Sequence, residues 1–123
     1  MSHSILITDD SATVRQQLRG FLEEKGFAVV EADNGARGLE IAQDSALDLI
    51  IVDVNMPVMN GIEMIKKVRE LEAHKKTPIF VLTTDAAGSA ARKGKEAGAN
   101  AWIVKPFKPD VLLKGIQKVV ASA

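Results

Sequence analysis

The stretch Leu47-Asp48-Leu49-Ile50-Ile51-Val52 decides the fold, because it is nearly continuously apolar and is followed directly by one acidic residue, Asp53. Six residues are too few for a helix, and the Ile and Val side chains favour a strand. A strand that lacks polar alternation is covered on both faces, as strands are in parallel sheets. The stretch therefore predicts a buried parallel strand that ends at Asp53.

Four more short runs rich in Val and Ile resemble this one, and amphipathic stretches separate them. The additional predicted strands are Ser4 to Thr8, Ala28 to Ala32, Pro78 to Thr83 and Ala101 to Val104. Helices are predicted after Ser11, from Asn34-Gly35, from Asn60-Gly61, from Ser89 to Ala97, and from Pro109 to about Ala121. Strands that alternate with helices predict an α/β protein with a parallel sheet, and 123 residues suit one domain.

Composition excludes several classes of protein. The chain has no cysteine, so disulfides and thiolate metal sites are ruled out, and it has no apolar stretch near the ~20 residues of a membrane span. The N-terminus lacks the pattern of a signal peptide. His3 and His74 lie far apart without ligand spacing, and we interpret both as solvated surface residues.

The charges are balanced overall but not along the chain. The 16 basic and 16 acidic residues give a net charge of zero, which argues against a nucleic-acid binder. Residues 1–85 hold 9 basic and 14 acidic side chains, whereas residues 86–123 hold 7 basic and 2 acidic ones. The net charge of zero is therefore the sum of an acidic part and a basic part of the chain, and each part can attract an oppositely charged partner.

Polar residues follow four of the predicted strands. They are Asp9 and Asp10 after the first, Asp53 after the third, Thr83-Thr84-Asp85 at the end of the fourth, and Lys105-Pro106 after the fifth. Parallel strands place their carboxyl ends at one edge of the sheet, so these groups should converge. Crowded carboxylates repel one another unless a cation compensates, and oxygen ligands favour Mg²⁺, with Mn²⁺ as a substitute. One carboxylate would then be left to act as a nucleophile.

These residues resemble the motifs of one family. The motifs are Ile5-Leu6-Ile7-Thr8-Asp9-Asp10-Ser11, Asp53-Val54-Asn55-Met56-Pro57-Val58-Met59-Asn60-Gly61, Leu82-Thr83-Thr84 and Val104-Lys105-Pro106-Phe107. In order and spacing they resemble the bacterial response-regulator receiver domain, and especially its stand-alone chemotaxis CheY-like members. The resemblance implies a flavodoxin-like doubly wound sandwich with strand order 2-1-3-4-5. It also implies one receiver domain over residues 1–123 with no output domain, and the ending at Ala121-Ser122-Ala123 favours a stand-alone protein.

The resemblance implies a role for each site residue. Asp53 is the expected phosphoacceptor, and Asp10, Asp53 and the Asn55 carbonyl are expected to ligate Mg²⁺ while Asp9 holds metal-bound water. Lys105 and Thr83 would bind the phosphoryl group, and the Lys105–Pro106 peptide bond is expected to be cis. Asn55, Thr84 and Asp85 would tune hydrolysis of the acyl phosphate. We also expect Gly61 to need an unusual backbone angle.

The same family transmits phosphorylation to a face built from the fourth helix, fifth strand and fifth helix. Thr83 and an aromatic residue, here Trp102, form the expected switch. Trp102 and Thr84 depart from the family's usual Tyr or Phe and Ala or Gly, and Thr84 predicts slow autodephosphorylation. The expected output face consists of Arg92, Lys93, Lys95, Trp102, Lys108, Lys114 and Lys118.

The implied partners are a CheA-like sensor histidine kinase, a flagellar switch protein with an acidic segment, and a phosphatase. The expected protein is a cytoplasmic monomer that is not an enzyme acting on other molecules and that binds neither nucleic acid nor membrane. A haloacid-dehalogenase-like phosphatase would need an acid where Asn55 stands, and a flavodoxin-like cofactor binder would have its phosphate repelled by Asp9 and Asp10. A phosphorelay intermediate, or a receiver that controls pili or development, stays open.

Overall fold

A computed structural model of the protein describes residues 3–56, 58–84 and 88–120. The chain forms a five-stranded sheet flanked by helices, with one short 3-10 helix, η1 (Glu72–His74). The strands are β1 (Ser4–Thr8), β2 (Ala28–Ala32), β3 (Leu49–Asp53), β4 (Ile79–Thr83) and β5 (Ala101–Val104). The helices are α1 (Ala12–Glu24), α2 (Gly35–Asp44), α3 (Gly61–Glu70), α4 (Ser89–Ala97) and α5 (Pro109–Val120).

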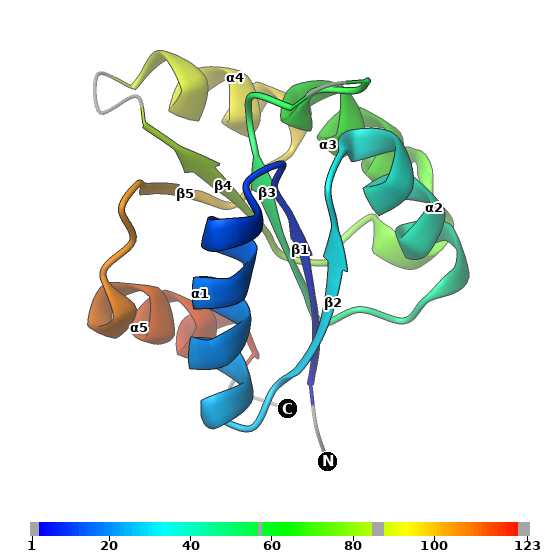
Figure 1. Ribbon diagram of the computed structural model, residues 1–123. Helices are drawn as coiled ribbons and strands as arrows, with labels where there is room; N and C mark the ends of the chain where they lie inside the picture. The colour runs from blue at the N-terminus through cyan, green and yellow to red at the C-terminus, as the bar shows by residue number, and fades with distance from the viewer. Residues whose placement is uncertain (1–2, 57, 85–87, 121–123) are drawn as a thin grey trace.

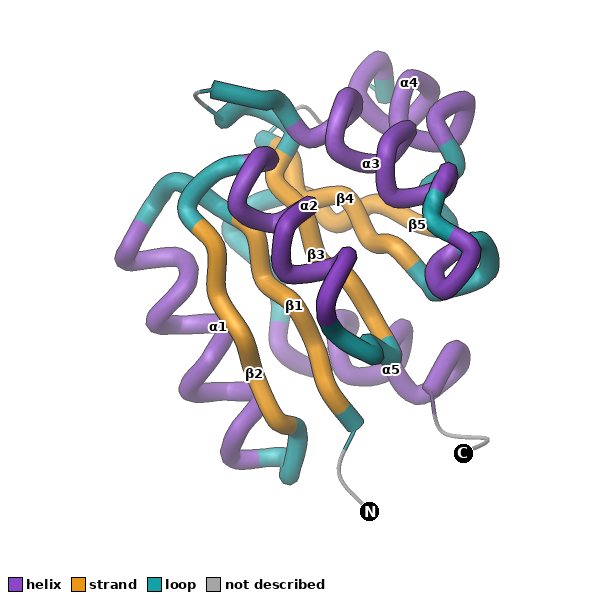
Figure 2. The backbone as a smooth tube through the Cα atoms, turned by 90° about the vertical axis from the view of Figure 1, so that its right-hand side faces the viewer, coloured by secondary structure: helices purple, strands orange, loops and turns teal. Residues whose placement is uncertain are grey.

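The sheet is parallel throughout and has the order β2-β1-β3-β4-β5, which confirms the predicted flavodoxin-like topology. Figure 1 shows β1, β2 and β3 running upward side by side, with their carboxyl ends toward the top of the view. In Figure 2, α2 and α3 lie in front of the sheet and α1 and α5 lie behind it. The result is a three-layer sandwich.

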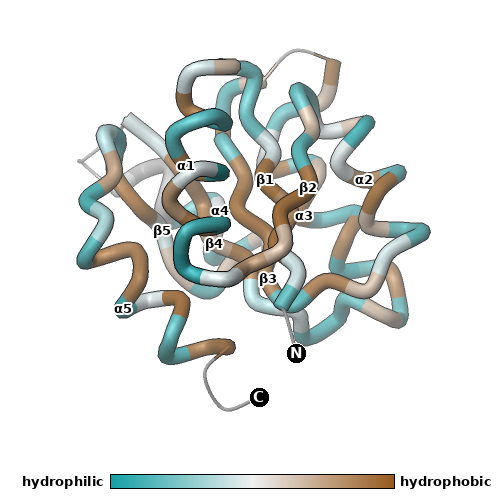
Figure 3. The backbone as a smooth tube through the Cα atoms, turned by 60° about the horizontal axis from the view of Figure 1, so that its bottom comes forward, coloured by the Kyte–Doolittle hydropathy of each residue, from teal (hydrophilic) through white to brown (hydrophobic). Residues whose placement is uncertain are grey.

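Two hydrophobic clusters fill the two interfaces between the sheet and its helices. Leu6, Ile50 and Val81 face α2, α3 and α4, whereas their strand neighbours Ile5 and Ile51 face α1 and α5. Both clusters are made mostly of side chains that are fully buried, because successive strand residues point to opposite faces and each face is covered. Figure 3 shows the strands as a brown, apolar centre between helices of mixed hydropathy.

Side-chain caps start three of the helices where the sequence predicted. Ser11, Asn34 and Asn60 each accept a hydrogen bond from a backbone N–H in the first turn of α1, α2 and α3. Ser11 and Asn34 cap their helices within three residues of a strand end, whereas a longer loop separates Asn60 from the end of β3.

Two strand boundaries differ from prediction. β3 begins at Leu49 and not at Leu47, because Asp48 pairs with Ser4 through its backbone and its carboxylate before the ladder starts. β4 begins at Ile79 because Pro78 has no N–H to donate. Among the described residues, no helix combines the length and apolar character needed to cross a bilayer.

Candidate functional site

Residues from four strands meet at the carboxyl edge of the sheet, as the sequence predicted. Thr8 lies beside Val52 in the register, so the next residues, Asp9 and Asp53, stand level with each other. Thr83 is the last residue of β4, and its carbonyl accepts a hydrogen bond of 2.7 Å from the Lys105 N–H after β5. The parallel register therefore brings two carboxylates, a hydroxyl and an ammonium together from distant parts of the chain.

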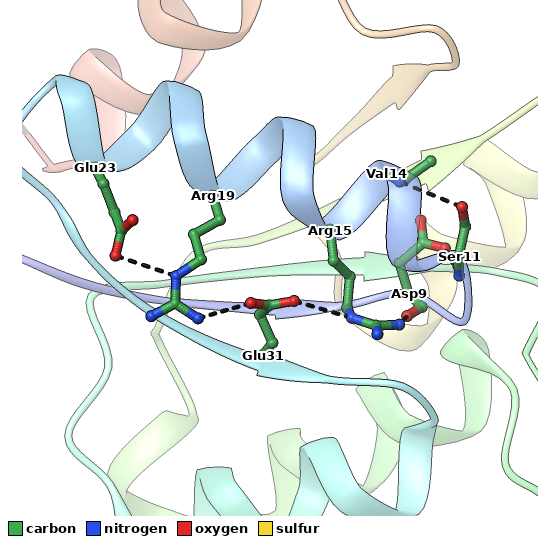
Figure 4. Close-up of polar contacts among 7 residues, drawn as sticks. All are labelled: Asp9, Ser11, Val14, Arg15, Arg19, Glu23 and Glu31. Carbon is green, nitrogen blue, oxygen red and sulfur yellow. Dashed lines mark hydrogen bonds and ion pairs between the residues drawn. The ribbon is translucent and has the colours of Figure 1, made fainter.

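The turn between β1 and α1 carries two of the carboxylates. The Asp9 N–H donates to the Ala32 carbonyl at 3.1 Å, which continues the pairing of β1 with β2 by one residue. Asp9 Oδ1 accepts from the Ser11 N–H at 2.9 Å, and Ser11 Oγ caps α1 by accepting from Val14 (Figure 4). Asp9 is fully buried and Asp10 is exposed, so only Asp10 of this pair faces solvent.

The three carboxylates form a tight cluster around one lysine. Asp9, Asp10 and Asp53 each offer an oxygen, and these oxygens lie within 4.8 Å of one another. Lys105 Nζ lies 2.9 Å from Asp9 Oδ2 and 3.3 Å from Asp53 Oδ1. Among the described residues, one ammonium thus stands against three carboxylates, which leaves this cluster with an excess of negative charge.

Burial and charge shift the proton equilibria of the cluster. Burial, and after it the charge of the neighbouring Asp9 carboxylate, raise the pKa of Asp53 to about 6 against the opposing effect of Lys105. Burial alone would lower the pKa of Lys105, but its hydrogen bond to Asp9 and the charges of Asp53 and Asp9 outweigh burial and raise it. Lys105 therefore stays charged, while ionised Asp53 is destabilised by its surroundings.

The donor set fits a hard divalent cation. Its ligand atoms are carboxylate oxygens at a partly exposed edge of the sheet. Mg²⁺ typically binds proteins through one or two carboxylates while it keeps several of its water ligands. Asn55 follows Asp53 by two residues and is exposed, so it lies in the loop that borders the cluster. These residues could hold Mg²⁺, as the sequence predicted, with Lys105 supplying the remaining positive charge.

Gly61 lets the start of α3 approach the end of β3 closely, but a different property of glycine is needed there than the sequence predicted. Gly61 does not have a positive φ, so the expectation of an unusual backbone angle is wrong. A Cβ there would instead lie 2.1 Å from the Asp53 carbonyl oxygen, which only glycine avoids. The unusual angle belongs to Val58, which has φ 70° and is 84% exposed in the loop between β3 and α3.

The predicted switch and tuning residues have different surroundings. Thr83 is buried at the end of β4, and Trp102 is half exposed on the edge strand β5. Thr84 is exposed directly after Thr83. The Lys105–Pro106 peptide bond is cis, as expected. Asp85, predicted to tune hydrolysis, lies outside the described residues.

The predicted output residues are all exposed, but only some of them gather. Arg92, Lys95 and Trp102 line a groove of about 420 Å³ between α4 and β5. The others are exposed elsewhere on α4, in the loop before α5 and on α5, and none of them lines that groove: Lys93, Lys108, Lys114 and Lys118.

Some polar contacts were not predicted from the sequence, among them those of His74 and of Glu31. His74 is buried, with Nε2 2.8 Å from the Ala42 carbonyl oxygen, so the interpretation of this residue as solvated is wrong. Arg15 and Arg19 of α1 share the Glu31 carboxylate of β2. The only sequence signal for the contacts of Glu31 was the four-residue spacing of the two arginines, which places them on one face of a helix.

A comparison with known families identifies this arrangement. The model of the response regulator receiver domain matches residues 5–117. The chain belongs to the response regulator receiver family. The expected family and fold are therefore confirmed. Transcriptional regulatory protein SrrA of Staphylococcus aureus is 40% identical over 115 residues, which are 93% of this chain and 46% of SrrA. The chain thus spans about half the length of the curated relatives it matches.

Solved receiver structures share the whole fold. Chemotaxis protein CheY4 of Vibrio cholerae has a TM-score of 0.92 and 43% sequence identity, and the match covers 97% of this chain and 99% of CheY4. The receiver domain of sensor histidine kinase PA1611 of Pseudomonas aeruginosa has a TM-score of 0.92 and 25% identity, covering 98% and 99% of the two chains. That structure contains a magnesium ion in its active-site cleft.

Proposed function

We propose that this receiver domain accepts a phosphoryl group on Asp53 from a sensor histidine kinase, in a Mg²⁺-dependent reaction in the cytoplasm. The observation that carries the proposal is the cluster itself: Asp53 is buried at the end of β3, within 4.8 Å of the Asp9 and Asp10 oxygens, and pairs with Lys105. Receiver domains pair with histidine kinases or phosphotransfer proteins. The magnesium ion in the PA1611 receiver supports the same chemistry here.

The reaction forms a bond between an Asp53 oxygen and phosphorus and breaks the nitrogen–phosphorus bond of a phosphohistidine. The leaving imidazole nitrogen keeps the electron pair and takes a proton from solvent. Asp10, Asp53 and the Asn55 carbonyl would hold Mg²⁺, with Asp9 holding a water on it. When bound, Mg²⁺ supplies neutralisation of the charge on the transferred oxygens.

The chain's own residues position and neutralise the transferred group. Lys105 Nζ lies 3.3 Å from Asp53 Oδ1, so its ammonium is within reach of oxygens on a group attached there. Thr83 stands at the end of the neighbouring strand β4, where its hydroxyl can bind the same group. Water later hydrolyses the acyl phosphate, which returns Asp53 to its carboxylate form, and Asn55, Thr84 and Asp85 would set that rate.

The experiment is phosphorylation with a small acyl phosphate and Mg²⁺, followed by intact-protein mass spectrometry. Wild type should gain one phosphoryl group, and Asp53→Asn should gain none. Asp44→Asn is the matched control, because Asp44 is an exposed aspartate at the end of α2. Labelling of Asp53→Asn at the wild-type rate would overturn the proposal.

The output we propose is a chemotaxis or flagellar switch protein that binds the face containing Arg92, Lys95 and Trp102. CheY4 supports this choice, because its chain matches nearly the whole of this one at 43% identity. Phosphorylation would shift Thr83 and Trp102 and change the affinity of that face for an acidic segment. The phosphorylated protein should bind an acidic switch peptide more tightly than the unphosphorylated one, and the difference should shrink in high salt.

A second output is favoured by SrrA, which is named a transcriptional regulatory protein and is 40% identical to this chain. In that case the receiver would control a neighbouring DNA-binding segment. Phosphorylation-dependent dimerisation without binding to the switch peptide would favour this second output over the first.

A further inference from the structure

Arg15 connects helix α1, strand β2 and the turn between β1 and α1 that carries Asp9 and Asp10, which we call the acidic turn. Its Nε donates to Glu31 Oε1 at 3.0 Å, and its Nη1 donates to the backbone carbonyl of Asp9 at 2.7 Å. The Arg15 side chain is only 18% exposed, so the guanidinium is held between these two acceptors (Figure 4). A planar guanidinium holds five N–H donors in a fixed arrangement, so Arg15 can serve the carboxylate and the carbonyl from different nitrogens.

Glu31 holds this arginine in place. Its second oxygen accepts from Arg19 Nη1 at 2.7 Å, so the carboxylate is clamped between two arginines one helical turn apart. Hydrogen bonds from Arg19 and then Arg15 lower the pKa of Glu31, although burial opposes them. Glu31 is therefore an ionised anchor at neutral pH.

Arg15 and Arg19 differ in one respect that matters for the site. Both bind Glu31 and so both link α1 to β2, but the Arg19 Nε donates to Glu23, one turn further along the helix. Arg15 instead reaches the acidic turn. Linking the helix to the strand therefore does not require the contact with Asp9.

The carbonyl that Arg15 binds belongs to the peptide group between Asp9 and Asp10. Because that group is planar, fixing its oxygen also fixes the nitrogen and Cα of Asp10. The other groups of Asp9 are already held: the N–H by Ala32, Oδ1 by the Ser11 N–H and Oδ2 by Lys105. Arg15 therefore constrains the backbone from which the exposed Asp10 carboxylate extends.

We propose that Arg15 is a positioning residue for the divalent-cation site, acting through the Asp9–Asp10 peptide group and held in place by Glu31. The proposal rests on the proposed function in that it takes the acidic cluster to bind Mg²⁺. Residues that orient metal ligands typically change metal affinity by about 10–100-fold when they are replaced. The contact here runs through the backbone, so we expect the lower end of that range.

The test compares Arg15→Lys with Arg19→Lys by calorimetric titration of the whole protein with Mg²⁺ alone. Arg15→Lys should weaken Mg²⁺ binding by about tenfold, whereas Arg19→Lys, which lacks contact with Asp9, should stay within about twofold of wild type. Glu31→Gln should weaken binding as well, because it frees Arg15. Unfolding in EDTA should show similar stability for the two lysine variants, which separates positioning from a general structural role.

The amide NMR signals of Asp10 and Ser11 give a second readout without any metal. They should shift in Arg15→Lys and stay in place in Arg19→Lys. Equal Mg²⁺ affinity of Arg15→Lys and wild type, or an equal loss in both arginine variants, would overturn the positioning role. Absence of saturable Mg²⁺ binding by wild type would instead overturn the proposed function.

Discussion

The two ends of the sheet hold their polar groups in opposite ways. At the carboxyl end, three carboxylates share one lysine, and the pKa of Asp53 rises to about 6 because burial and the charge of Asp9 outweigh Lys105. At the amino end, the Arg69 guanidinium donates to the carbonyls of Gly98, His74 and Thr77 at 2.6–3.0 Å. At the carboxyl end the negative charge of the carboxylates exceeds the charge of Lys105. At the amino end the positive charge of Arg69 is balanced by hydrogen bonds to neutral carbonyl groups.

The amino end is a closed network that ties four segments together. Arg69 Nη2 also donates to Asn100 Oδ1, which accepts from the Ile79 N–H that begins β4. His74 lies beside it, with Nε2 near two carbonyls at the end of α2 and Nδ1 2.9 Å from Thr77 Oγ1. Buried groups with all their partners stabilise a fold, while crowded like charges favour a ligand. The amino end therefore stabilises the fold, whereas the carboxyl end leaves like charges crowded together.

The largest expected effect is the loss of the amino-end network. Arg69→Met leaves the carbonyls of Gly98, His74 and Thr77 without their donor, so it should lower the free energy of unfolding by about 3 kcal/mol in urea titrations. Lys67→Met is the control, because Lys67 is exposed on the same helix and should change stability by less than about 0.5 kcal/mol. Equal losses in the two variants would show that the network does not stabilise the fold.

The opposite change is expected at the carboxyl end. Asp53→Asn removes a buried charge that its surroundings oppose, so it should raise the free energy of unfolding by about 1–3 kcal/mol at pH 8 in EDTA. The gain should shrink when Mg²⁺ is added, because Mg²⁺ stabilises wild type more than the variant. A less stable variant in EDTA would contradict the picture of crowded carboxylates.

Glu31 offers a third test, because its pKa is lowered by Arg19 and Arg15 against an ordinary value of 4.5. A carboxyl whose folded pKa is depressed stabilises the fold above its unfolded pKa and loses that contribution as pH falls through the folded value. Glu31→Gln should therefore be about 1 kcal/mol less stable than wild type at pH 7, and this difference should shrink as the pH falls below 4.5. A difference that does not change with pH, or that Glu40→Gln reproduces, would show that the ionised carboxylate is not the cause.

The smallest effect concerns backbone strain in the loop between β3 and α3. Val58 has φ 70° although it is β-branched, and its side chain is 84% exposed. Val58→Asn should raise stability by about 0.5–1 kcal/mol, because Asn tolerates left-handed backbone. The control is Val111→Asn, an exposed valine in α5 without this angle, which should change stability little. A destabilised Val58→Asn variant would mean that the loop does not hold this strain.

Most of the fold was predictable because its signals are local. Short apolar runs identified the strands, and residues such as Asn34 and Asn60 marked helix starts through bonds to N–H groups three residues away. The acidic cluster was predictable too, since parallel strands end at a common edge and Asp9 and Asp53 each follow a strand.

The unpredicted contacts join residues that are distant in sequence. Arg69 and Gly98 are 29 residues apart, and His74 meets Ala42 across 32 residues. No periodicity distinguishes Arg69 from an exposed helical arginine or His74 from a loop histidine. Gly61 shows the same limit, because its need for a small side chain comes from the approach of the Asp53 carbonyl and not from its own backbone angle.

The most direct test of the central claim is to locate the phosphoryl group chemically. The protein is treated with an acyl phosphate, the product is reduced with borohydride, and the peptides are sequenced by mass spectrometry. Borohydride converts a phosphorylated aspartate to homoserine. We predict homoserine at position 53 alone, formed with Mg²⁺ and absent with EDTA. Homoserine at another aspartate, or equal conversion in EDTA, would contradict the assignment of Asp53 and of the Mg²⁺ site.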